Sequence, residues 1–368
     1  MRRDSLVHLP AVLSSEQPHT DARYVMGVDG GATKTLAAVL DLRTLEGTLQ
    51  GGQAGEKVLH LGHGGPSNED AVGAQAAVEA LLGAADEALE RAGIEAAELG
   101  AAVLAIAGTD TADVERNVRA ARTDAWIVVN DVVAAWATAT GVGPGVAAIA
   151  GTGSNVFGVN LDGGETRAWR AGGWGHLIGD EGSGYWLGVQ SIKAGLRDRE
   201  ASGPPTAITD CAPAFFGVAS IEAVAALVYS KPLRKGEIAA FAIETARLAE
   251  QGDAVACGLY ERGARELGEQ VAAVIRQTGL GEADASGAAR EFPVGLIGSA
   301  YKAGPVFVDP LTRAIHEHAP GARVGTVEMA PVGGSLLLAA RACGNSDAVA
   351  PPELSRLLDE ALRAAQTV

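Results

Sequence analysis

Cysteine is scarce in this sequence. Its 368 residues include three, Cys211, Cys257 and Cys343, which are widely spaced and form no Cys-x-x-Cys pair. This spacing argues against a disulfide framework or a zinc knuckle and fits a reducing compartment, so we expect a cytoplasmic protein. Aromatic residues make up only 4% of the chain, so Ala, Val, Leu and Gly must do most of the packing.

Clusters of basic residues are also missing. Lys and Arg number 29 against 45 Asp and Glu, which gives a formal net charge of −16. A chain of this charge repels a nucleic-acid backbone, so we expect no nucleic-acid partner. An anionic small ligand would have to be held by backbone N–H groups and a metal ion.

Long apolar runs are absent as well. No uncharged apolar run approaches the ~20 residues that cross a bilayer, so we expect a soluble protein with no membrane partner. Residues 1–23 begin with two arginines, but their apolar stretch LVHLPAVL is short and is broken by His8 and Pro10. This is a poor signal peptide, and we expect a flexible N-terminal extension instead.

The length of the chain predicts two domains. In the first half, strand and helix patterns alternate, which indicates a mostly parallel sheet covered on both faces. The expected strands are 24–28, 36–42, 101–107 and 126–129, and the expected helices are 112–122 and 70–92, the latter ended by Gly93.

The second half opens with the same plan as the first. The stretch VAAIAGTGSNVFGVN (146–160) repeats the pattern of YVMGVDGGATKTLAAVL (24–40): an apolar strand, a glycine-rich turn with Thr or Ser, and a second strand. Two such hairpins, each opening one half of the chain, predict duplicated α/β domains that face each other. Beyond residue 183 we expect helices at 185–197, 221–228, 236–250, 253–278, 310–318, 336–341 and 353–365, a strand at 293–297 and a loop at 281–290.

The two glycine-rich turns are candidate phosphate sites. DGGATKT (29–35) places a carboxylate at a strand end, followed by glycines that let the backbone approach an anion, and by hydroxyl and cationic donors. AGTGSN (150–155) offers the same groups from the other half. Neither matches the Walker or Rossmann pattern. The turns could clamp a triphosphate between two domains, or they could need glycine for conformation only.

Two side chains ahead of expected helices have two readings each. Asp131 follows the strand WIVVN, so it could cap the next helix or act as a functional carboxylate at the end of a strand, where open α/β sheets bind ligands. Asn68 in HGGPSNED could likewise cap a helix or hydrogen-bond a sugar hydroxyl or acetamido group.

The stretch GWGHLIGDEGSGYW (173–186) holds five glycines among two tryptophans, a tyrosine, a histidine and the pair Asp180-Glu181. It cannot be a regular strand or helix interior, because each glycine costs roughly 0.5 to 1 kcal/mol there relative to alanine. It is therefore an irregular connection or a binding loop.

Taken together, these motifs resemble the N-acetylglucosamine kinases. DGGATKT, GGPSN, NDVVAAWATAT, IAGTGSN, GWGHLIGDEGSGYW and the IGSAYKAG segment occur in the order found in that family. It belongs to the actin-like sugar kinase superfamily, in the branch shared with the benzoyl-CoA reductase activating ATPases. The resemblance covers about residues 24 to 345. Ala32 departs from it, since many relatives have a third glycine there, and residues 1–23 have no counterpart.

The resemblance implies an α/β fold of two actin-like (ribonuclease H-like) domains facing each other across a nucleotide- and sugar-binding cleft. The N-terminal domain would span 24–141 and the C-terminal domain, with helical insertions, 142–350, while the C-terminal helix 351–368 could complete the first. A homodimer is also expected.

The resemblance also implies roles for individual residues. Asp29 would hold the Mg²⁺ shell, and Asp131 would be the general base at the sugar's 6-hydroxyl. The ATP contacts would be Gly30, Gly31, Thr33, Lys34, Thr35, Gly151, Thr152, Gly153 and Ser154, with Gly252, Gly298, Ser299 and Ala303 near the adenosine. The amino sugar would be held by Ser67, Asn68, Asp131, Gly173, Trp174, Gly175, His176 and Asp180. Asp180 could also cap the helix that follows. His176 could instead hold the shape of its loop, and the role of Glu181 stays open.

The implied activity is phosphorylation of the 6-hydroxyl of N-acetyl-D-glucosamine by ATP with Mg²⁺. Glucosamine, N-acetylmannosamine and N-acetylmuramic acid are alternative substrates. An ATPase activator of a CoA-dehydratase or reductase would need cysteines for a [4Fe–4S] cluster between subunits, and the three cysteines here lie in apolar or helical contexts. A non-catalytic sugar sensor would be expected to lose the base or the phosphate donors, and these are present.

Overall fold

The computed structural model describes Leu13 and residues 21–31, 33–49, 58–108, 112–122, 126–161, 165–230, 233–282, 289–345 and 349–366. Most of the expected extension 1–23 and of the expected loop 281–290 lies outside these residues. The chain forms two compact units. Unit 1 comprises Met1–Gly143 and Val327–Val368, and unit 2 comprises Pro144–Thr326.

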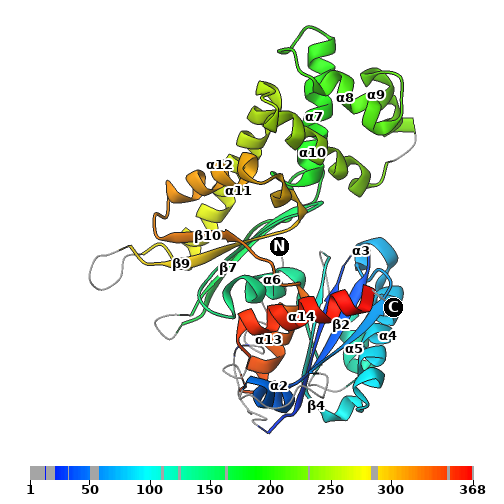
Figure 1. Ribbon diagram of the computed structural model, residues 1–368, viewed down its shortest axis with the longest axis vertical. Helices are drawn as coiled ribbons and strands as arrows, with labels where there is room; N and C mark the ends of the chain where they lie inside the picture. Colours follow the sequence, from blue (N-terminus) through cyan, green and yellow to red (C-terminus); the bar gives the residue numbers. More distant parts are fainter. Residues whose placement is uncertain are drawn as a thin grey trace. The chain divides into compact units, whose positions relative to one another are not determined.

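Unit 1 is built on a five-stranded mixed sheet (Figure 1). Its strands are β1 (Tyr24–Gly30), β2 (Thr35–Asp41), β3 (Leu59–Gly64), β4 (Leu99–Ile106) and β5 (Trp126–Asn130). They lie in the order β3-β2-β1-β4-β5, where β1, β2 and β3 pair antiparallel and β4 and β5 run parallel to β1. Every residue of β2 is buried, as expected for a strand inside a sheet that is covered on both faces.

Helices cover both faces of the unit 1 sheet. They are α2 (Leu42–Leu49), α3 (Glu69–Val72), α4 (Ala74–Ala92), η2 (Ala96–Glu98), α5 (Ala112–Ala121), α6 (Asp131–Thr140), α13 (Val332–Ala342) and α14 (Pro351–Gln366). Side chains alternate along β1. Met26 and Val28 pack in one core with residues of α4 and α5, whereas Gly27 faces α13, where a Cβ on it would lie 2.6 Å from the backbone nitrogen of Leu336.

The chain returns to unit 1 earlier than the expected domain boundary. The C-terminal domain was expected to run to residue 350, but unit 2 ends at Thr326. The reason is the packing of α13 on β1, where Ser335 Oγ donates a 2.9 Å hydrogen bond to the carbonyl oxygen of Val28. Helix α14 packs on α13, with Leu358 against Gly333.

The expected helix 70–92 is in fact two helices. Gly73, with a φ of 82°, separates α3 from α4. Helix α4 ends at Gly93 in the left-handed conformation, as predicted. It packs closely on β3, where a Cβ on Gly62 would lie 2.0 Å from the carbonyl oxygen of Ala84. Strand β3 was not expected, because LHLGHG contains two glycines and no β-branched residue.

Unit 2 repeats the topology of unit 1. Its strands are β6 (Gly145–Ala150), β7 (Ser154–Asn160), β8 (Arg167–Gly172), β9 (Phe292–Ile297) and β10 (Ala322–Thr326). The order is β8-β7-β6-β9-β10, with β6, β7 and β8 antiparallel and β9 and β10 parallel to β6. Both sheets thus share one strand order, and the duplication predicted from the two hairpins is confirmed.

Unit 2 has more helices than expected, and most of the expected ones are longer than predicted. They are α7 (Gly184–Arg199), α8 (Ile208–Phe216), α9 (Ile221–Ser230), α10 (Lys235–Glu250), α11 (Ala254–Thr278), η4 (Ser299–Ala303) and α12 (Pro305–His316). Phe241, Tyr260 and Phe307 bring α10, α11 and α12 into one core.

In the described part of the chain, no single helix is long and apolar enough to span a membrane. Helices α8 and α9 pass that test only as a pair bent by 46°.

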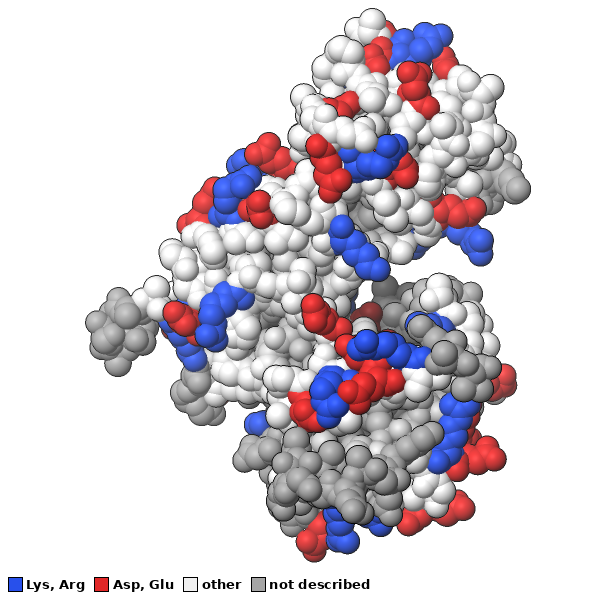
Figure 2. Space-filling model, viewed as in Figure 1, with Lys and Arg blue, Asp and Glu red and all other residues white. Residues whose placement is uncertain are grey.

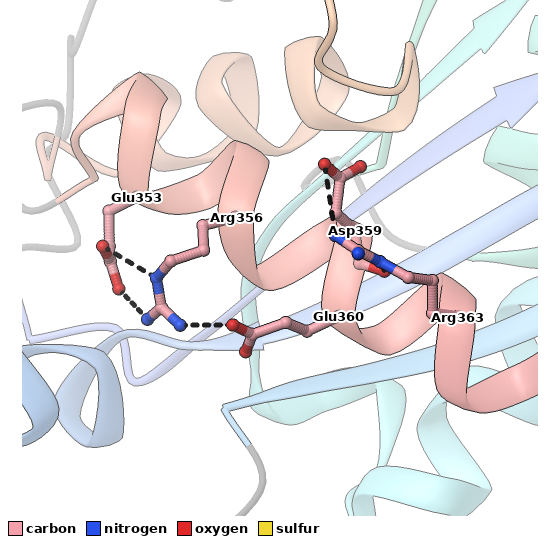
Figure 3. Close-up of polar contacts among 5 residues, drawn as sticks. All are labelled: Glu353, Arg356, Asp359, Glu360 and Arg363. Atoms are coloured by element: carbon pink, nitrogen blue, oxygen red, sulfur yellow. Dashed lines mark hydrogen bonds and ion pairs between the residues drawn. The ribbon is translucent and has the colours of Figure 1, made fainter.

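Charged side chains of both signs lie side by side on the surface (Figure 2). Figure 2 shows acidic and basic residues interspersed on the face that it draws. Helix α14 is an example (Figure 3): Arg356 forms ion pairs with Glu353 and Glu360, and Arg363 pairs with Asp359 one turn later. Such exposed pairs contribute at most about 1 kcal/mol each, so α14 is held mainly by its buried leucines.

Candidate active site

The carboxyl edge of the unit 1 sheet gathers the two carboxylates singled out in the sequence. Asp29, near the end of β1, lies beside Ala105 of β4, and Asn130 at the end of β5 lies beside Ile106 of β4. Asp131 follows Asn130 directly. The strands that lead to Asp29 and Asp131 are therefore two positions apart, about 10 Å, and end at the same edge.

Asp131 does not cap helix α6. The N-cap is Asn130, whose Oδ1 accepts a 3.3 Å hydrogen bond from the backbone nitrogen of Val132 and whose Nδ2 donates a 3.0 Å bond to the carbonyl oxygen of Gly108. Asp131 is the first residue of the helix and is partly buried. The capping reading of Asp131 is wrong, and its carboxylate lies at the positive end of the helix dipole.

Asp29 is an unusual carboxyl group. Burial raises its pKa to about 6, and the positive charge of Lys34 opposes this effect. A bound cation would favour the carboxylate and bring the pKa down again. Thr33 and Lys34 are both exposed, so their side chains are accessible to a ligand, while Ala32 lies outside the described residues.

The DGGATKT turn is fastened to the GGPSN loop. Gly31 donates its backbone N–H to Lys34 and accepts a bond from the backbone nitrogen of Ser67, at 3.1 and 3.0 Å. The hydroxyl groups of Thr35 and Ser67 are hydrogen-bonded at 2.8 Å, and both side chains are buried. A Cβ on Gly30 would lie 2.5 Å from Ser67 Oγ, so the tight junction requires glycine there. Thr35 and Ser67 thus position the two loops.

Asn68 follows this junction. It occupies the N-cap position of α3, but its side chain makes no capping hydrogen bond. Its Oδ1 is buried and has no hydrogen-bond partner within the described residues. The capping reading is therefore wrong here too. A buried amide oxygen without a partner costs free energy, and a ligand hydroxyl or N–H group would satisfy it.

In unit 2 the AGTGSN turn is docked on the start of α7. Gly151 donates to the carbonyl oxygen of Gly153 at 2.9 Å. The backbone nitrogens of Gly184 and Tyr185, in the first turn of α7, donate to the carbonyl oxygens of Gly151 and Thr152 at 2.8 and 3.3 Å. These contacts fix the shape of the turn that is expected to meet the phosphates.

Asp180 reaches the same turn. Its Oδ1 accepts a 3.3 Å bond from the backbone nitrogen of Ser154, and a Cβ on Gly153 would lie 3.0 Å from its Oδ2. Burial raises the pKa of Asp180, against the hydrogen bond from Ser154 and the charges of Lys235 and His176. Asp180 does not cap α7, because Ser183 does so by accepting from the nitrogen of Trp186. Asp180 also adopts a positive φ of 62°, which is uncommon outside glycine.

The loop that contains Asp180 is shaped by glycines. Gly173 and Gly175 have positive φ values of 71° and 83°, as expected for glycines in an irregular connection. Trp174 is 55% exposed, so its ring is available to a ligand. His176 packs edge-on against Tyr185, with ring centroids 5.1 Å apart, and burial together with the charge of Lys235 lowers its pKa.

The segment expected near the adenosine adjoins the AGTGSN turn. A Cβ on Gly298 would lie 2.3 Å from the carbonyl oxygen of Ala150, so this segment lies beside the end of β6, where the turn begins. Ser299 and Ala303 form the ends of η4, and Tyr301 between them donates to the carbonyl oxygen of Ala148 at 3.0 Å. Gly252 follows α10, a helix that packs against η4.

Three residues near these motifs were not predicted. Gln270 on α11 donates a 3.0 Å bond to Glu181 Oε2, and Lys235 at the start of α10 acts electrostatically on Asp180. Asn155 contacts the loop at Gly173. Asn155 could have been found, since it belongs to the AGTGSN motif. Gln270 and Lys235 lie on helices far along the chain, and no sequence signal ties them to the loop.

The cysteines are poorly suited to ligating a cluster. Cys343 is buried, which raises its pKa to about 11, and burial and Glu244 also raise the pKa of Cys211. Cys257 donates to the carbonyl oxygen of Ala249. Iron–sulfur ligation requires thiolates, which these surroundings disfavour. Among the described residues, no three His, Cys, Asp or Glu side chains form a metal-binding group.

Comparison with known proteins agrees with this geometry. The model of the BadF/BadG/BcrA/BcrD ATPase family matches residues 26–339. The N-acetylmuramic acid/N-acetylglucosamine kinase of Clostridium acetobutylicum is 33% identical over 258 residues, which cover 69% of this chain and 79% of that protein. The N-acetyl-D-glucosamine kinase of Dictyostelium discoideum is 25% identical over 333 residues, 85% of this chain and 97% of that one.

A solved structure resembles the fold as well. The crystal structure of a candidate N-acetylglucosamine kinase from Chromobacterium violaceum has a TM-score of 0.63 at 23% identity and covers 86% of this chain and 99% of that chain. The fold is thus that of the actin-like sugar kinases. The chain belongs to the BadF/BadG/BcrA/BcrD ATPase family.

Proposed function

We propose that the protein is a kinase that transfers the γ-phosphoryl group of ATP to the 6-hydroxyl of N-acetyl-D-glucosamine. Two relatives named as kinases of this sugar, one of them 33% identical, support the proposal. The observation that carries it is the placement of Asp131: the carboxylate lies at the edge of the sheet where Asp29 and the DGGATKT turn also lie, and Asn130 takes over the cap.

Asp131 is proposed to act as the general base. It would accept the proton of the sugar 6-hydroxyl as the oxygen attacks the γ-phosphorus and the bond to the leaving ADP breaks. The exposed Thr33 and Lys34 would contact phosphate oxygens from unit 1, and the exposed Thr152 would do so from unit 2. Ser154 was expected to contact ATP too, but it is buried and its hydroxyl is bonded to Glu181, so it would support the turn instead. Little covalent help is needed in such a transfer, so positioning these groups is the main task of the protein.

Asp29 is a suitable Mg²⁺ ligand. Mg²⁺ prefers oxygen ligands and is usually held by one or two carboxylates together with substrate phosphates. Burial raises the pKa of Asp29, and a cation held beside it would oppose this effect and favour the ionised carboxylate. When bound with ATP, Mg²⁺ neutralises phosphate charge.

The sugar would be held by two loops. In unit 1, the Oδ1 of Asn68 needs a hydrogen-bond donor, and a sugar hydroxyl or acetamido N–H group supplies one. In unit 2, Gly173, Trp174 and Gly175 offer backbone groups and an exposed ring, and Asp180 an acceptor.

N-acetylmuramic acid is the second candidate substrate, because the 33% identical relative is named for both sugars. It differs from N-acetylglucosamine by a lactyl group at C3.

The three cysteines are all free thiols, which supports the proposal of a cytoplasmic enzyme.

A coupled ADP-release assay tests the proposal. The purified protein is given Mg²⁺ and ATP with N-acetylglucosamine, N-acetylmuramic acid, N-acetylmannosamine, glucosamine or glucose in turn. The expected result is the highest kcat/KM for N-acetylglucosamine. Far better turnover of glucosamine than of its N-acetyl form would refute the assigned specificity.

A further inference from the structure

We propose that Gln270, on helix α11, is a positioning residue for sugar recognition: its amide nitrogen bonds Glu181 after the loop 173–180, and its amide oxygen lies against Gly172 before it. The inference rests on the proposed function, which assigns this loop to the sugar. Gln270 lies about 90 positions along the chain from the loop, and the proposal depends on what its amide group contacts.

The amide nitrogen of Gln270 fastens the far end of the loop. It donates a 3.0 Å hydrogen bond to Glu181 Oε2, and the residue is partly buried. The carbonyl oxygen of Glu181 in turn accepts a 2.8 Å bond from Ser154 Oγ of the AGTGSN turn. Glu181 is therefore held from two sides, by a helix and by the phosphate turn.

The amide oxygen of Gln270 lies against the near end of the loop. Gly172, the last residue of β8, has a φ of 74°, and a Cβ on it would lie 2.3 Å from Gln270 Oε1. The neighbouring Gly173 is similarly close to Asn155, because a Cβ added to Gly173 would lie 2.6 Å from Asn155 Nδ2. The loop thus begins with two glycines, Gly172 and Gly173, and the amide groups of Gln270 and Asn155 pack closely against them.

Glu181 also lies near a like charge on α11. Glu266 lies one turn before Gln270 on α11, and its pKa is raised by burial and then by the negative charge of Glu181, against the charge of Arg262. Glu181 is thus beside a second carboxylate that repels it. The N–H donor of Gln270 offsets this repulsion and keeps Glu181 against α11.

Displacement of Glu181 would alter sugar binding by moving Asp180, the neighbouring residue. The two residues are adjacent, and both contact Ser154, one through its backbone oxygen and the other through its carboxylate. A loop released at Glu181 would lose the orientation of Asp180 and of the backbone at Gly173. The reacting groups of unit 1 would be untouched, so the loss should fall on the KM for the sugar more than on kcat.

The test compares Gln270→Met, which keeps length and removes the hydrogen bond, with Gln190→Met as a control. Gln190 is a partly buried glutamine on α7 of the same unit, and its side chain accepts a 2.9 Å hydrogen bond from Arg262. We expect Gln270→Met to raise the KM for N-acetylglucosamine about tenfold, the size of effect expected for a lost charge-assisted bond, with kcat little changed. Glu181→Gln keeps an acceptor but loses the charge, so it should raise the KM less than Gln270→Met does.

A double-mutant cycle isolates the pair. Glu181→Ala should raise the KM as Gln270→Met does, and the double variant should add nothing further. Additive effects, or a Gln270→Met variant with the wild-type KM and a lower Tm, would show that Gln270 only packs.

Hydrogen exchange separates this inference from the proposed function. Faster exchange of residues 173–180 in Gln270→Met, but not in Gln190→Met, is expected whether or not a sugar is phosphorylated. Equal exchange in the two variants overturns the positioning role. A wild-type protein that phosphorylates no sugar overturns the proposed function instead.

Discussion

The hydroxyl groups of Thr35 and Ser67 share a 2.8 Å hydrogen bond between two buried side chains. Thr35 also donates to the carbonyl oxygen of Gly65 at 2.7 Å. One bond therefore joins the strand after the DGGATKT turn to the loop that carries Asn68. The proposed phosphate and sugar contacts of unit 1 share this support.

Ser67→Ala should loosen both contacts at once. It leaves the buried Thr35 hydroxyl with one hydrogen-bond partner fewer, and we expect a loss of about 1 kcal/mol in stability. The KM values for ATP and for sugar should both rise, because the two loops are joined. Thermal unfolding and steady-state kinetics measure these effects. Thr35→Ser, which keeps the hydroxyl, serves as the control. A Ser67→Ala protein with unchanged Tm and KM values would show that the bond joins nothing of functional importance.

Asn68→Ala should separate sugar binding from helix capping. Because Asn68 makes no capping bond, its removal should leave the Tm unchanged, whereas a lost cap costs about 1 kcal/mol. The KM for N-acetylglucosamine should rise about tenfold, as for a lost ligand hydrogen bond, with the KM for ATP unchanged. A fall in Tm at constant KM would favour the capping role that the sequence alone suggested.

Asp41→Asn should alter how stability depends on pH. Burial alone would raise the pKa of Asp41, but hydrogen bonds from Arg23 and Thr44 outweigh it and hold the pKa below its usual value. A carboxylate whose pKa is lower in the folded state stabilises above its unfolded pKa of about 4, and this stabilisation is lost as the pH falls through the folded pKa.

The Asp41→Asn protein should therefore have a lower Tm at pH 7 and a shallower loss of Tm between about pH 5 and pH 3. Thermal scans across this range measure both effects. Arg363→Gln, in an exposed pair of α14, is the control and should change neither. If the wild type and Asp41→Asn proteins lost stability in parallel as the pH fell, the carboxylate of Asp41 would not have a lowered pKa.

The sequence was informative where the structure is local. Both hairpins, their glycine-rich turns and the end of α4 at Gly93 depend on neighbouring residues, and the patterns predicted them. Caps were misjudged by one to three positions. Asn130 rather than Asp131 caps α6, and Ser183 rather than Asp180 caps α7, because the backbone decides which of several suitable side chains meets the first N–H groups.

Contacts between distant segments could not be predicted. Nothing in the spacing of Gln270 and Glu181, or of Ser335 and Val28, signals that they meet. Such pairs depend on how helices pack on the sheet, and the helix pattern records only which face is apolar. The unexpected strand β3 has the same origin, since its glycines suit the close approach of α4 rather than strand formation.

The role of Asp131 tests the account most directly. ADP release with saturating N-acetylglucosamine and ATP is measured for the wild type and Asp131→Asn, and calorimetry measures sugar binding to both. Loss of a general base should lower kcat about 10²- to 10⁴-fold while the Kd for the sugar changes little. An Asp131→Asn enzyme that retains wild-type turnover would contradict the proposed mechanism.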